Sequence, residues 1–80
     1  MGEIVKGGIY EHFKGNRYHV LGIAHNSETR EDMVVYRALY GEAEVWVRPL
    51  WMFTETIERD GKKLQRFSYT GEINEKGTLD

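Results

Sequence analysis

The sequence has no cysteine and only one proline among its 80 residues. The lack of cysteine excludes a disulfide framework, thiol nucleophiles and cysteine-ligated zinc or iron–sulfur centres. No segment approaches the ~20 consecutive apolar residues that a membrane-spanning helix needs. No long apolar segment follows the first charged residues either, so nothing resembles a secretion signal. We therefore expect one small cytoplasmic domain with no membrane partner.

The sequence also lacks a surplus of positive charge. It holds 11 Lys and Arg against 13 Asp and Glu, which gives a formal net charge of -2 with neutral histidines. Proteins that bind nucleic acid without sequence preference mostly neutralise phosphates with excess Lys and Arg. The balance therefore disfavours RNA or single-stranded nucleic-acid binding. This alternative stays open if the fold gathers four basic residues into one patch: Lys14, Arg17, Arg37 and Arg48.

Aromatic residues, in contrast, are abundant: five Tyr, three Phe and two Trp. Apolar residues recur in short blocks between Gly, Asn and Asp turn signals, a pattern that favours strands over helices. We predict an all-β domain over residues 1–69, a small SH3-like barrel of five or six short antiparallel strands with one helical turn after Pro49. An oligonucleotide-binding-fold barrel is a weaker alternative, because it usually contains more chain and a longer helix. Residues 70–80 are predicted to form a polar tail, or at best an edge strand.

Strands are predicted at residues 8–13, 18–25, 33–40 and 45–48, with a tight turn at Lys14-Gly15-Asn16 and an exposed loop over residues 26–32. In the fourth strand we expect Val45 and Val47 to face inward, while Trp46 and Arg48 share the other face. Pro49 ends this strand because it has no N–H to donate. The apolar helical turn that follows it is expected to plug one end of the core.

Asp60-Gly61 is a strong signal for a two-residue hairpin turn. A register fixed at this turn pairs apolar with apolar and acidic with basic residues: Ile57 with Leu64, Glu58 with Lys63 and Glu55 with Arg66. Such cross-strand pairs stabilise antiparallel strands. We therefore predict a hairpin centred on this dipeptide.

An ordered series of short motifs covers most of the chain. The motifs are Gly8-x-Tyr10-x-His12-Phe13-Lys14-Gly15-Asn16-x-Tyr18-x-Val20-Leu21-Gly22-Ile23-Ala24, His25-x-Ser27-Glu28-Thr29, Val34-Val35-Tyr36-Arg37, Leu39-Tyr40-Gly41, Trp46-Val47-Arg48-Pro49, Met52-Phe53 and Arg66-Phe67. From Gly8 to Phe67 this series resembles the mainly bacterial family called domain of unknown function 1653, or DUF1653. Many members carry a proline before the closing Arg-Phe, where this chain has Gln65. The resemblance implies a small single domain. It assigns neither an activity nor catalytic residues to the chain.

Three histidines, His12, His19 and His25, raise the question of a metal site. Their separations exceed the roughly two to five residues between neighbouring ligands of zinc motifs, so we predict no metal and no cofactor. His25, Ser27 and Glu28 lie too close together to favour triad geometry, and loop hydrogen bonds account for them. We predict no catalytic residues, although a small hydrolase or transferase using His12, His25 or Glu28 stays open as an alternative.

The strongest candidates for a ligand site are aromatic and arginine side chains. Arg37 shares a strand face with Val35 and Leu39, an unusual place for a cation unless it reaches an opening or an acid. An Arg beside aromatic rings can bind carboxylate or phosphate, and aromatic clusters can cage cations. The competing interpretation is that Tyr and Trp fill a small core. The candidate ligand-binding residues are Tyr10, Tyr36, Arg37, Trp46 and Arg48, within a wider set that adds Tyr18, Tyr40, Trp51 and Arg66.

These patterns together predict a small non-enzymatic binding or interaction module. Its aromatic and arginine face is expected to take a peptide, a modified side chain or a small anionic ligand. We expect a monomer, or a weak dimer formed through an uncovered edge strand.

Overall fold

The structure is a computed structural model that describes residues 4–72. Within this range the chain forms seven strands and one helical turn: β1 (Gly8–His12), β2 (Arg17–His25), β3 (Asp32–Ala38), β4 (Val45–Pro49), α1 (Leu50–Phe53), β5 (Thr56–Arg59), β6 (Lys62–Gln65) and β7 (Phe67–Glu72). The prediction of an all-β chain with one helical turn after Pro49 is confirmed.

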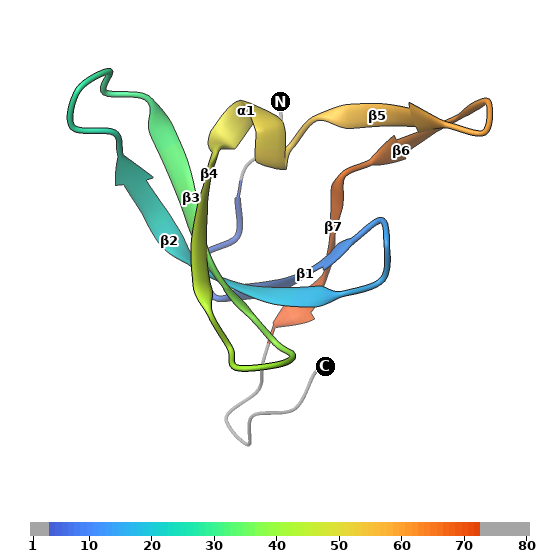
Figure 1. The fold of residues 1–80 in the computed structure, drawn as a ribbon, viewed down its shortest axis with the longest axis horizontal. Coiled ribbons are helices and arrows are strands. Elements are labelled where there is room, and N and C mark those ends of the chain that lie inside the picture. The colour runs from blue at the N-terminus through green and yellow to red at the C-terminus, as the bar shows by residue number, and fades with distance from the viewer. Residues whose placement is uncertain (1–3, 73–80) are drawn as a thin grey trace.

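The strands form one curved sheet and one separate hairpin (Figure 1). The sheet has the order β4-β3-β2-β1-β7, and all of its neighbours are antiparallel. The hairpin β5–β6 extends away from the sheet on the side opposite the β2–β3 loop (Figure 1). Within residues 4–72 no pairing joins β4 to β7, so the sheet ends at these two strands.

Both predicted tight turns are present, and their backbones show why glycine is needed. Gly15 has φ 109° between β1 and β2, while Asp60 and Gly61 have φ 54° and 76° between β5 and β6. Positive φ at both central residues is the mark of a type I′ hairpin turn, whose twist suits paired strands. The predicted hairpin register is confirmed, with Ile57 opposite Leu64.

The predicted orientation of β4 is wrong. Val45 and Val47 are 48% and 59% exposed, and they lie opposite residues on the outer face of β3. Trp46 lies opposite the buried Tyr36, so Trp46 and Arg48 are on the inner face. β4 is an edge strand beside a mouth of the curved sheet, where long side chains reach the core and short ones cannot. The alternation of side chains therefore predicted correctly which residues of β4 share a face, but it did not predict which face is turned inward.

The core is aromatic, and α1 closes it as predicted. Its buried cluster consists of Tyr10, Val20, Val34, Tyr36, Phe53 and Phe67. Phe53, from α1, is 1% exposed, and its ring stacks on Phe67 of β7 with centroids 4.0 Å apart and an interplanar angle of 5°. Tyr10 and Tyr36 meet the Phe53 ring edge-on at 5.3 and 5.2 Å. These rings join α1 to β1, β3 and β7.

The ends and loops of the described chain complete the fold. β7 runs to Glu72, so Gly71 and Glu72 of the predicted tail pair with β1, and residues 73–80 lie outside the described range. The predicted loop after β2 is organised by Asn26, whose side-chain oxygen accepts the backbone N–H groups of Glu28 and Thr29. No helix within residues 4–72 has the length and apolar character required to cross a membrane.

Candidate functional site

Tyrosine, histidine and arginine side chains lie together on the inner face of the curved sheet, at one open end that we call its mouth. Strand pairing puts Tyr10 opposite Tyr18, and His12 opposite Phe67, on this face. Because side chains opposite each other point to the same side of a sheet, β1, β2 and β7 contribute to one surface. We call the following residues the inner-face cluster: His12, Tyr18, Tyr36, Tyr40, Arg48 and Phe67.

Arg48 is the cation of this cluster, and aromatic groups hold it. Its Nε donates to the hydroxyl of Tyr36 at 3.3 Å, and its guanidinium carbon lies 5.7 Å from the centre of the Phe67 ring. A guanidinium has five N–H donors, so the single bond to Tyr36 leaves its terminal donors for another partner. The side chain is half-buried and fixed in direction.

The tyrosines form a second layer beside Arg48. The hydroxyls of Tyr18 and Tyr40 share a hydrogen bond of 2.8 Å. The Tyr18 ring also meets the rings of Tyr36 and Phe67 edge-on at 5.3 and 5.6 Å. Burial, the hydrogen bond to Tyr40 and the neighbouring phenols raise the pKa of Tyr18 to about 12. The phenol therefore stays protonated at neutral pH. Because one hydroxyl of the Tyr18–Tyr40 pair donates to the other, one O–H of the pair is left for another acceptor.

His12 lies at the β1 end of the cluster, in a positive environment. Its ring meets Phe67 edge-on at 4.9 Å, and its Nδ1 accepts the backbone N–H of Lys14 at 3.1 Å. Burial, followed by the positive charges of Arg66, Arg48 and Lys14, lowers the pKa of His12 below its ordinary value of 6.5. Burial disfavours a charge of either sign, whereas the three nearby positive charges disfavour a further proton and favour an anion.

Arg48 differs from its neighbours in having no acidic partner. Arg66 is held by Glu55, with Nε and Oε2 2.6 Å apart, and Arg17 lies 3.5 Å from Glu11. Among the side chains that the structure describes, no carboxylate lies within ion-pair distance of Arg48. A half-buried arginine without a carboxylate is a natural place for an anionic ligand.

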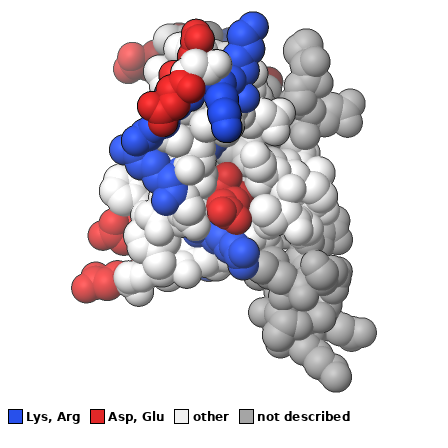
Figure 2. Space-filling view, turned by 90° about the vertical axis from the view of Figure 1, so that its right-hand side faces the viewer, with Lys and Arg blue, Asp and Glu red and all other residues white. Residues whose placement is uncertain are grey.

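The surface around the hairpins carries charges of both signs. Figure 2 shows one side of the molecule, on which Lys and Arg alternate with Asp and Glu and form no continuous positive area. A nucleic-acid groove of the usual kind would show a basic stripe. The side of the molecule in Figure 2 shows no such stripe.

The five sequence-predicted ligand residues are brought together only in part. Tyr36 and Arg48 touch, and Trp46 lies beside Tyr36 across β3 and β4. Trp46 is 48% exposed and lines a shallow recess of about 220 Å³ together with Tyr40. Tyr10 is 6% exposed and lies in the core. Arg37 is exposed on the outer face of β3, opposite Val45, away from the other four.

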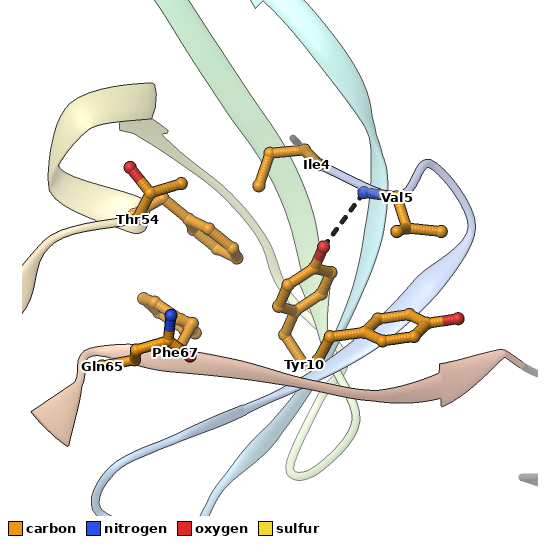
Figure 3. A pocket seen from close by; sticks show the side chains of 8 residues that line it. Ile4, Val5, Tyr10, Thr54, Gln65 and Phe67 are labelled. Atoms are coloured by element: carbon orange, nitrogen blue, oxygen red, sulfur yellow. Dashed lines mark hydrogen bonds between the residues drawn. The ribbon is translucent and has the colours of Figure 1, made fainter. Parts of the chain in front are cut away.

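A separate pocket of about 290 Å³ lies behind the aromatic core (Figure 3). Its lining is mostly apolar and aromatic: Ile4, Val5, Tyr10, Phe53, Thr54, Gln65, Phe67 and Tyr69. The hydroxyl of Tyr10 points toward the N-terminal segment and accepts the backbone N–H of Val5 at 3.0 Å (Figure 3). The hydroxyl of Tyr10 thus already has a hydrogen-bond partner within the protein.

The three histidines lie apart in the structure. His12 joins the inner-face cluster, and His25 at the end of β2 is exposed, with Nδ1 3.0 Å from Oδ1 of Asp32. Within residues 4–72 no group of three or more His, Cys, Asp or Glu side chains is arranged to hold a metal ion. His25, Ser27 and Asp32 line an open surface pocket of about 440 Å³.

The ligand prediction omitted two residues of this site, His12 and Phe67. His12 was considered only as a metal ligand or catalytic group. The two-residue alternation of side chains along the predicted strand could have placed His12 in the site. His12 is two residues after Tyr10, so both point to the same face of β1. The tight turn at Gly15 then brings Tyr18 back onto that face.

The comparisons with known proteins agree with this fold. The model of the family "Protein of unknown function (DUF1653)" matches residues 8–69. A crystal structure of a DUF1653 protein from Bordetella bronchiseptica is similar, with a TM-score of 0.77 and 36% sequence identity. The similarity covers 88% of this chain and 92% of that one. No curated protein matches the chain. With a family match over most of its length, the chain belongs to the family of unknown function DUF1653.

Proposed function

We propose that this protein is a small non-enzymatic binding module whose inner-face cluster takes an anionic group, a carboxylate or a phosphate, of a peptide or small molecule. The observation that carries the proposal is the state of Arg48. Its guanidinium is half-buried, held by Tyr36 and Phe67, and has no carboxylate partner among the described side chains.

The surroundings of Arg48 favour an anion over other ligands. The planar guanidinium matches the two oxygens of a carboxylate or phosphate, and its stacking on a ring fixes that plane. The positive charges that lower the pKa of His12 act on a ligand at the same place. The hydroxyl pair of Tyr18 and Tyr40 adds one O–H donor, and the aromatic rings can contact an apolar part of the ligand.

We also propose that the scaffold is an SH3-like barrel that stays open between β4 and β7. The strand order β4-β3-β2-β1-β7 and the helical turn between β4 and the later strands support this assignment. The β5–β6 hairpin is then an insertion before the last strand of the barrel. The inner-face cluster lies at one mouth of such a barrel, where small barrels commonly bind ligands.

An NMR titration with inorganic phosphate and with acetate tests the anion site. We expect the Nε–H signal of Arg48 to move in the wild-type protein, together with the His12 ring signals. Arg48→Gln keeps a polar side chain and should abolish the shifts. Arg37→Gln is the matched control, because it removes the same charge from the outer face of the neighbouring strand.

Two results would reject the proposal. One is that neither anion shifts the cluster signals at low salt; the other is that Arg37→Gln weakens binding as much as Arg48→Gln. A parallel titration with labelled single-stranded oligonucleotides examines the nucleic-acid alternative. Salt-sensitive oligonucleotide binding in the absence of an anion effect at Arg48 would favour that alternative instead.

A further inference from the structure

The outer edge of β4 is open and apolar. Val45, Trp46 and Val47 are 48%, 48% and 59% exposed, and within residues 4–72 β4 pairs only with β3. An exposed edge strand with an apolar centre is a template for pairing with another strand. We propose that two copies of this chain dimerise by antiparallel pairing of β4 with β4, centred on Trp46. This inference does not rest on the proposed anion site.

The backbone of β4 shows which groups are available for this pairing. The N–H of Ala38 donates to the carbonyl of Glu44, so Glu44 points its backbone groups toward β3. In an antiparallel ladder these groups alternate in direction, so those of Trp46 and Arg48 also point toward β3. The N–H and C=O groups of Val45 and Val47 therefore point outward. They are the groups that a second copy must satisfy.

The register follows from the residues at the two ends of β4. With a two-fold axis at Trp46, Val45 of one copy faces Val47 of the other, and both use their outward groups. An axis at Val47 would place Val45 opposite Pro49, which has no N–H. An axis at Val45 would place Val47 opposite Ala43, whose φ of 55° is incompatible with a strand. Pairing centred on Trp46 avoids both problems.

The side chains are complementary in the same register. Glu44 of each copy faces Arg48 of the other, so each end of the paired strands carries opposite charges. In the dimer this carboxylate therefore competes with an anionic ligand for Arg48. The two Trp46 side chains adjoin on the inner face, and the four valines form an apolar strip on the outer face. Charge complementarity and matched backbone groups favour a second copy over an unrelated strand. The paired area is small, so we expect a dissociation constant on the order of 100 μM.

Sedimentation velocity of the full chain over a concentration series tests the dimer. We expect a reversible shift from monomer to dimer in the wild type. Val47→Pro removes an outward N–H that β3 does not use, and it should raise the dissociation constant by about tenfold or more. Glu44→Arg places like charges opposite each other, and it should weaken the dimer by about tenfold. Glu42→Arg is the matched control, with the same charge change in the β3–β4 loop outside the register.

The possible outcomes distinguish the proposal from its competitors. Circular dichroism checks whether each variant is folded. If Val47→Pro does not fold, Glu44→Arg still tests the interface. A wild type that stays monomeric at millimolar concentration overturns the proposal. It is also overturned if Glu42→Arg weakens association as much as Glu44→Arg. Species larger than dimers would point instead to head-to-tail pairing of β4 with β7.

Discussion

At the scale of single residues, His12 stands out because its protonation affects both a native hydrogen bond and the charge of the inner-face cluster. Its Nδ1 accepts the N–H of Lys14, which requires the neutral form of the ring. Burial and the nearby Arg66, Arg48 and Lys14 lower its pKa. Protonation of His12 therefore opposes the native hydrogen bond and adds a charge to a positive region. A fall in pH that protonates His12 therefore changes both the stability of the fold and the charge of the inner-face cluster.

The lowered pKa of His12 predicts a loss of stability on the acid side. Between its folded pKa and 6.5 the unfolded chain binds more protons at this site, so the free energy of unfolding falls as the pH falls through 6.5. His12→Gln removes this contribution. We expect urea denaturation to show a smaller loss between about pH 8 and about pH 5 in the variant than in the wild type. His25→Gln, at an exposed position, serves as the control. Equal losses in wild type and His12→Gln would contradict the assignment.

At the scale of elements, the β5–β6 hairpin was predictable from sequence and the facing of β4 was not. Asp60-Gly61 adopts the backbone geometry that the dipeptide favours, so a local signal sets the register of Ile57 with Leu64. In β4 the alternation of valines with Trp46 and Arg48 is equally clear. Which face turns inward depends on contacts with Tyr36 of the neighbouring β3 and with Phe67 of β7, which is distant in the sequence.

The base of the β5–β6 hairpin is predicted to depend on Arg66. Its backbone N–H donates to the carbonyl of Glu55 at 3.0 Å, and its side chain forms the half-buried ion pair with the same residue. The hairpin has no fully buried residue, so this pair is a main attachment. We expect Arg66→Gln to weaken the attachment by about 1 to 3 kcal/mol, measured as faster amide exchange in β5 and β6.

The matched control for that experiment is Lys63→Gln. Lys63 pairs with Glu58 within the hairpin, and both side chains are exposed, so its loss should change exchange little. Exchange in β2 and β3 should be unchanged in both variants, because their amides lie in the central sheet. If Arg66→Gln leaves the hairpin amides as protected as in the wild type, the ion pair is not the attachment.

At the scale of the whole molecule, the cluster is assembled by long-range pairing. His12 comes from β1, Tyr18 from β2, Tyr36 from β3, Arg48 from β4 and Phe67 from β7. Sequence identified the aromatic and arginine residue types, and it selected Tyr36 and Arg48 as candidates. It could not separate them from Tyr10 and Arg37, because burial and facing depend on how the sheet curves. Sequence alone thus identified the residue types of the candidate cluster better than which of those residues lie together.

The same assembly makes Phe53 decisive for the fold as a whole. Its ring is buried and contacts rings from three strands, so it connects α1 to β1, β3 and β7. Replacing a buried Phe by Ala costs about 3 to 5 kcal/mol, whereas a chain of 80 residues has a total stability of about 4 to 12 kcal/mol. We expect Phe53→Ala to lose a large part of the total stability, and Phe53→Leu to unfold in one cooperative transition at a lower urea midpoint than the wild type. Trp51→Ala is the control, because Trp51 lies in the same turn but is 57% exposed. If it lowers the midpoint as much as Phe53→Leu, the aromatic stack is not what unites the molecule.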